Sequence, residues 1–87
     1  MRSIENILLE IISLLRENQQ REWEKTFNFF LSSAAKHGKD TIRRDILSVY
    51  GGMGSFNDLI LYKNGNLNIK DNVKLDALRN ELFSLIK

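Results

Sequence analysis

A chain of 87 residues, 43% of them hydrophobic and 28% charged, is long enough for one domain with one core and too rich in Ile, Leu and Phe to be disordered. The absence of cysteine excludes a disulfide framework and thiol chemistry, and no stretch approaches the roughly 20 apolar residues that span a bilayer. A formal net charge of +2 is too small to indicate a nucleic-acid partner by itself. We therefore expect a single soluble, cytoplasmic domain over residues 1–87.

Two stretches near the N-terminus repeat hydrophobic residues at three- and four-residue spacing, which predicts two amphipathic helices. The first helix is expected over about residues 3–17, with Ser3 as its N-cap. The second is expected over about residues 20–37, with a hydrophobic stripe that begins at Trp23. Gly38 readily adopts left-handed geometry, so we expect it to end the second helix.

Two further helices are expected in the second half of the chain. The third should begin with Asp40 or Thr41 as its cap and end before the glycine pair at 51–52. The last should begin near Asp71 or Asn72 and run to the terminus. The chain contains no proline, which fits uninterrupted helices. The predicted fold is mainly α, a small bundle of four main helices.

The connection between the third and fourth helices contains two competing signals. Ser55 followed by Asp58 resembles a capping box with Asp in place of Glu, which predicts a short helix after a Gly-rich turn. The Asn-Gly pair at 64–65 favours a β-hairpin, in which Tyr62 would lie opposite Leu67. An isolated two-stranded hairpin is marginally stable. We therefore favour the short helix followed by a turn and keep the small hairpin as the alternative.

Signals for catalysis or cofactor binding are weak. The glycine-rich segment 51–55 lacks the lysine of a phosphate-binding loop, so we interpret it as a turn, with anion binding as the alternative. His37 is the single histidine, and Ser55 does not lie in a Gly-x-Ser-x-Gly motif. A zinc site would need several carboxylates brought together by the fold. We expect no catalytic residues, no metal and no cofactor.

Two features are candidates for a binding surface. Phe29 falls off the stripe of the second helix, so it either packs under another element or is exposed as an anchor for a partner. A cluster of basic residues, here called the basic corner, is the candidate footprint for nucleic acid, although phosphate contacts usually demand more charge. The basic corner consists of Lys36, Lys39, Arg43 and Arg44.

The segment 50–61, Tyr-Gly-Gly-Met-Gly-Ser-Phe-Asn-Asp-Leu-Ile-Leu, resembles the signature of a family of small bacterial proteins with no established biochemical activity. Trp23 and the Leu-x-x-Leu-Arg pattern that ends at Arg79 match the same family, so that the resemblance covers roughly residues 20–87. Members of this kind resemble small cytoplasmic immunity proteins, including those of contact-dependent growth-inhibition systems. The resemblance implies an inhibitor that binds and blocks the nuclease-like domain of a toxin.

Together these observations predict a non-catalytic binding protein, an immunity protein that occludes the active site of its toxin. The alternative is a small nucleic-acid-associated regulator that uses the basic corner. We expect Asn57 and Asp58 to pair with cationic residues of the toxin. The predicted contacts lie on the rim of the glycine turn and on the basic corner: Met53, Asn57, Asp58, Lys36, Lys39, Arg43 and Arg44.

Overall fold

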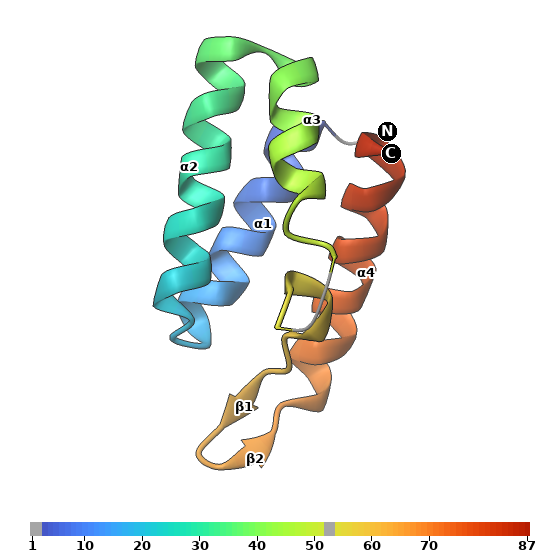
Figure 1. The fold of residues 1–87 in the computed structure, drawn as a ribbon. Helices are drawn as coiled ribbons and strands as arrows, with labels where there is room; N and C mark the ends of the chain where they lie inside the picture. Colours follow the sequence, from blue (N-terminus) through green and yellow to red (C-terminus); the bar gives the residue numbers. More distant parts are fainter. Residues whose placement is uncertain (1–2, 52–53) are drawn as a thin grey trace.

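The computed structural model describes residues 3–51 and 54–87, apart from the side chain of Lys39. Within these residues the chain forms four α-helices, one 3-10 turn and one two-stranded antiparallel hairpin (Figure 1). The elements are α1 (Ile4–Glu17), α2 (Arg21–His37), α3 (Lys39–Leu47), η1 (Phe56–Asp58), β1 (Tyr62–Lys63), β2 (Asn66–Leu67) and α4 (Ile69–Ile86). The predicted mainly α bundle of four helices is confirmed, and no helix among the described residues is long and apolar enough to cross a membrane.

The first helix is the centre of the core. It packs against both α2 and α4, while α3 bridges α2 and α4 (Figure 1). Contact on two sides explains why the hydrophobic stripe of α1 is so wide. Its buried residues are Ile4, Ile7, Leu8, Ile11, Ile12, Leu14 and Leu15.

Among the first three helices, two predicted boundaries are confirmed and one is wrong. The hydroxyl of Ser3 accepts a hydrogen bond from the backbone N–H of Asn6 at 3.1 Å, as expected of an N-cap. Gly38 has a φ of 84° and ends α2. The same residue also precedes the first residue of α3, so neither Asp40 nor Thr41 caps that helix. The sharp Gly38 connection leaves no extended residue on which such a cap could form.

The last helix begins earlier than Asp71 or Asn72, at Ile69. Its cap is Asn68, whose side-chain oxygen accepts a hydrogen bond from the backbone N–H of Asp71 at 3.3 Å. The predicted start is wrong because Ile69 is 67% exposed, so the buried stripe does not mark the first turn of this helix.

The connection between α3 and α4 contains both a short helix and a hairpin. The short helix is the single 3-10 turn η1. The predicted capping box does not form, because the side chain of Ser55 makes no cap hydrogen bond and the carboxylate of Asp58 accepts from the backbone N–H of Gly54, at 3.0 Å, instead of that of Ser55. The hairpin, which we had ranked second, forms with Tyr62 opposite Leu67. It follows from these contacts that a turn alone does not describe residues 59–69.

Candidate binding surface

A buried arginine fastens the connecting segment to α4. Nη1 of Arg79 donates to the carbonyl oxygens of Phe56 at 2.7 Å, Asn57 at 3.2 Å and Leu59 at 3.1 Å. Nη2 of Arg79 donates to the carboxylate of Asp76, one turn earlier on α4. Bonds from a charged donor are stronger than neutral ones, so this side chain fixes the position of the segment on the helix.

An aromatic cluster lies beneath the same segment. The ring of Phe56 is fully buried, and its centre lies 4.6 Å from that of Phe27, 5.4 Å from that of Trp23 and 5.9 Å from that of Tyr50. The hydroxyl of Tyr50 donates to the carbonyl oxygen of Arg79 at 3.0 Å. Burial raises the pKa of Tyr50 above its ordinary value, and the charge of Arg79 opposes this in part. The cluster gives the segment a rigid base.

Asn57 and Asp58, two of the predicted contact residues of the glycine turn, are exposed, but their side chains also hold the turn. Nδ2 of Asn57 donates to the carbonyl oxygen of Tyr50 at 2.9 Å, and Oδ2 of Asp58 accepts from Gly54. Met53 lies outside the described residues. Each of the two described side chains therefore has one polar atom engaged within the loop.

Two hollows flank the segment from Asp58 to Ile60. One, of about 360 Å³, lies toward Trp23 and Tyr62. The other, of about 400 Å³, lies toward Leu67 and α4. Asp58 and Ile60 line both, so this segment forms a ridge between them.

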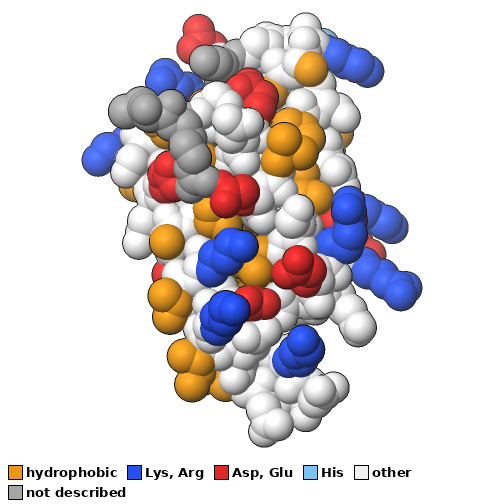
Figure 2. Space-filling view, turned by 180° about the vertical axis from the view of Figure 1, so that it is seen from behind, with side chains coloured by type: hydrophobic (Ala, Val, Ile, Leu, Met, Phe, Trp, Pro, Cys, Tyr) orange, Lys and Arg blue, Asp and Glu red, His pale blue; other side chains and the backbone are white. Residues whose placement is uncertain are grey.

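Hydrophobic side chains are exposed at the end of this ridge, on the hairpin and on the first two turns of α4. Every one of them is at least half exposed, and hydrophobic side chains reach the surface along the edge formed by α4 (Figure 2). We call this set the hairpin surface. Its members are Ile60, Tyr62, Leu67, Ile69 and Val73.

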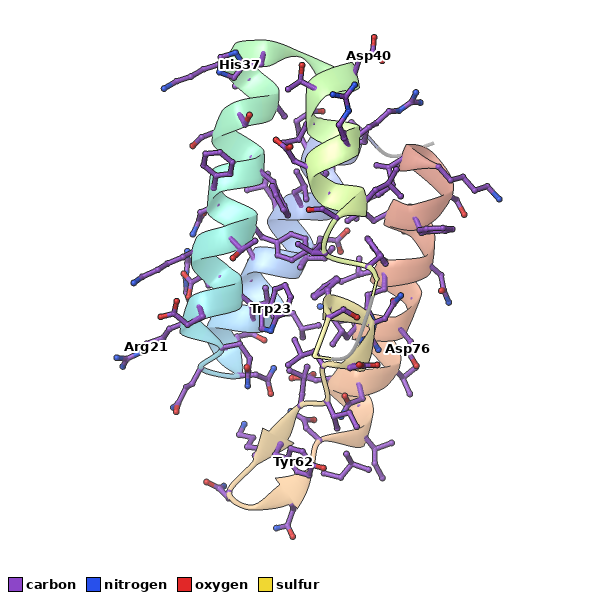
Figure 3. All side chains as sticks on the ribbon, in the orientation of Figure 1. Arg21, Trp23, His37, Asp40, Tyr62 and Asp76 are labelled. Carbon is purple, nitrogen blue, oxygen red and sulfur yellow. The ribbon has the colours of Figure 1, made fainter. Side chains whose placement is uncertain are left out.

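The basic corner lies at the other end of the molecule. Figure 3 labels His37 and Asp40 at the connection between α2 and α3, away from Tyr62 on the hairpin. Lys36, Arg43 and Arg44 are exposed there, and the side chain of Lys39 lies outside the description. Nη2 of Arg43 donates to the carbonyl oxygen of Leu85 at 3.3 Å, in the last turn of α4. The structure thus separates the basic corner from Asn57 and Asp58.

Several features of this surface were not predicted from the sequence. Arg79 was noted as part of a motif and not as the residue that holds the loop. The hairpin surface was missed because its members come from the connection before β1, from both strands and from α4. One signal was available: Ile69 and Val73 are four residues apart and lie outside the stripe of the last helix, which is typical of an exposed apolar face. Phe29, for which two positions were open, is 61% exposed on α2.

A family model matches the chain. The model of a family described as a domain of unknown function (DUF6966) matches residues 16–68, which is more than half of the chain. The matched region runs from the end of α1 to the cap of α4 and includes the ridge and the hairpin. No curated protein and no solved structure matches the chain.

Proposed function

The chain belongs to the DUF6966 family, whose description assigns no activity, and we propose that it is a non-catalytic protein that acts by binding another protein. The hairpin surface carries this proposal. Small domains usually cover their large apolar side chains, and contiguous exposed ones are typical of interaction sites. Ile60 and Leu67 line one hollow, Ile60 and Tyr62 line the other, and Tyr62 pairs with Leu67, so these three side chains are neighbours.

The partner that we propose is a bacterial toxin, with this chain as its immunity protein. The resemblance of the segment 50–61 to immunity-type proteins supports this choice, and the ridge with Asn57 and Asp58 is part of that segment. The carboxylate of Asp58 would face cationic residues of the toxin active site, and the hairpin surface would supply the apolar contact. An interface of standard size, about 800 Å² on each partner, is large enough to include both.

The positions of the reactive side chains support a non-catalytic role. His37 is exposed at the end of α2 (Figure 3). Ser55 is buried and directly precedes Phe56 of the aromatic cluster, which contacts Trp23 near the opposite end of α2. A histidine must lie within hydrogen-bonding reach of a serine to activate it. These two residues are therefore poor candidates for a nucleophile and its base.

A nucleic-acid-associated regulator is the second candidate function. The exposed side chains of Lys36 and Arg44 support this candidate, because they could contact phosphates. Arg43 already donates a hydrogen bond to the C-terminal end of α4. Changing Arg43 and Arg44 to Ala should abolish a salt-sensitive retardation of DNA or RNA in gels. If the unmodified protein retards neither at low salt, this candidate fails.

Co-expression with the toxin encoded immediately upstream tests the first proposal. The tagged chain should co-purify with the toxin domain and protect the cells that express it. Leu67→Ser should weaken the complex about tenfold or more, because a buried interface side chain is lost. Leu9→Ser on α1 is the matched control, since Leu9 is 50% exposed and Leu67 is 52% exposed. Absence of both co-purification and protection would overturn the immunity function.

A further inference from the structure

The hollow between the ridge and α4 has the most specific chemistry on the hairpin side of the molecule. It combines apolar side chains with carboxylates in a volume of about 400 Å³. Such a mixture suits a ligand that is apolar along one part and cationic at one end. The apolar side of the groove includes Leu59, Ile60 and Leu67, and its acidic side includes Asp58 and Asp76.

The carboxylates of this groove face solvent, whereas the guanidinium of Arg79, which also lines it, is buried. The side chain of Asp76 is 67% exposed, and that of Arg79 is 10% exposed. Arg79 uses Nη1 on three backbone carbonyls and Nη2 on Asp76. Asp58 is exposed, and one of its carboxylate oxygens accepts from the backbone N–H of Gly54. The groove therefore presents negative charge to a partner.

Helix geometry keeps the nearest lysines of α4 away from the groove. Asn72 and Asp76 are four residues apart and line the same face. Lys70 and Lys74 are each two residues from Asn72, which places them on the other side of the helix. Their charges face away from the groove, and in water the interaction between well-separated surface charges is weak.

The geometry points to this groove as the site that takes an arginine side chain of the partner protein, together with an adjacent apolar residue. The inference rests on the proposed function and names the chemistry of the partner. A guanidinium is planar and pairs with carboxylates through two donors, so it fits Asp58 and Asp76 better than an ammonium does. Its aliphatic stem and the neighbouring apolar side chain would lie over Ile60 and Leu67, where they remove apolar surface from water.

Titration of the full chain with a short peptide tests the groove directly. The probe is acetyl-leucyl-arginine amide, and the matched probe is its citrulline analogue, which has nearly the same shape and no charge. In NMR spectra of the labelled protein, the arginine peptide should shift the amides of Ile60, Leu67, Asn72 and Asp76. Saturation is expected at roughly millimolar concentration, because a small ligand pairs here with exposed charges. The citrulline peptide should bind about two- to fivefold more weakly.

Three variants of the chain assign the effect to its residues. Asp58→Asn keeps an acceptor for Gly54 and removes the charge, so it should weaken the arginine peptide by about two- to fivefold and leave the citrulline peptide unchanged. Asp76→Asn should act in the same direction, although it also alters the contact with Arg79. Asp40→Asn is the control, because Asp40 is exposed at the other end of the molecule (Figure 3).

The outcomes separate this inference from the proposed function. Three results would contradict arginine binding at the groove. These are equal binding of both peptides, shifts that map to the basic corner, and no shifts at several times the expected saturating concentration. Concentration-dependent broadening of the same amides without peptide would also overturn it, since the occupant would then be a second copy of the chain. If the toxin co-purifies as tightly with the Asp58→Asn variant as with the unmodified chain, the proposed function stands. The assignment of the groove as the site for an arginine of the toxin is then wrong. Binding of the arginine peptide at the groove, with no complex between the chain and the toxin, would support the groove and overturn the immunity function.

Discussion

The guanidinium carbon of Arg79 lies 5.8 Å from the centre of the Phe56 ring, and Nη1 of the same side chain donates to the carbonyl oxygen of Phe56 at 2.7 Å. One side chain on α4 thus holds both the ring and the backbone of Phe56. Because Asn57 and Asp58 follow directly, the position of the ridge depends on this pair.

Replacing Arg79 by Met should lower the free energy of unfolding by about 2–4 kcal/mol. The substitution keeps a long apolar stem but leaves three backbone carbonyls without their charged donor. Urea denaturation measures the change. Arg44→Met is the control, because Arg44 is exposed on α3, and its effect should stay within about 0.5 kcal/mol. Equal midpoints for Arg79→Met and the unmodified chain would show that the arginine does not hold the segment.

Replacing Asn72 by Ala should loosen the base of the hairpin. The Asn72 amide accepts from the N–H of Leu61 and donates to its carbonyl oxygen, both at 2.9 Å. Without it, the Leu61 amide should exchange with solvent deuterium about tenfold faster. Asn80→Ala makes the same change in helix propensity at an exposed position of α4 and should leave this exchange rate unchanged. An unchanged rate in Asn72→Ala would contradict the role of this amide.

Gly38 should tolerate no side chain without a loss of stability. Its φ of 84° and ψ of 175° lie in a region that is essentially restricted to glycine. Gly38→Ala should therefore lower the free energy of unfolding by about 1–3 kcal/mol, measured by thermal or urea denaturation. At Gly51, whose φ is outside the positive region and around which an added Cβ meets nothing within 4 Å, the same substitution should have little effect. Equal losses at both positions would argue against strain at Gly38.

Stability should fall at high pH through Tyr50. Burial raises the pKa of this hydroxyl in the folded chain above the ordinary value of 10.0, so the unfolded chain releases the proton first. The contribution of Tyr50 is thus fully present below pH 10.0 and is lost as the pH rises above it. Tyr50→Phe should be about 1 kcal/mol less stable at pH 8, because it lacks the bond to Arg79, and this difference should shrink in more alkaline solution. Parallel pH curves for the two proteins would contradict the assignment.

The elements differ in how far their local sequence predicts them, and the reasons are physical. The bounds of α1 were predicted well because its hydrophobic stripe faces the core along its whole length and Ser3 is a strong local cap. The start of α4 was missed because Asn68 caps it and an exposed residue, Ile69, follows. The hairpin was ranked second because its support from Asn72 comes from eleven residues away along the chain. Local patterns do not contain that contact.

The candidate site shows the same division. The exposure of Asn57 and Asp58 was predicted from their place in a turn, and they are exposed. Their engagement with Tyr50 and Gly54 depends on how the loop closes, which the motif alone does not specify. Asp58 of η1 and Asp76 of α4 line the same groove, and only the fold places these two elements on either side of it.

The start of α1 and the end of α4 both lie in the half of the molecule away from the hairpin (Figure 1). A fluorescent protein or an immobilising anchor joined to either terminus would therefore sit far from the ridge. Attachment at either end should therefore leave the kinetics of binding at the ridge unchanged.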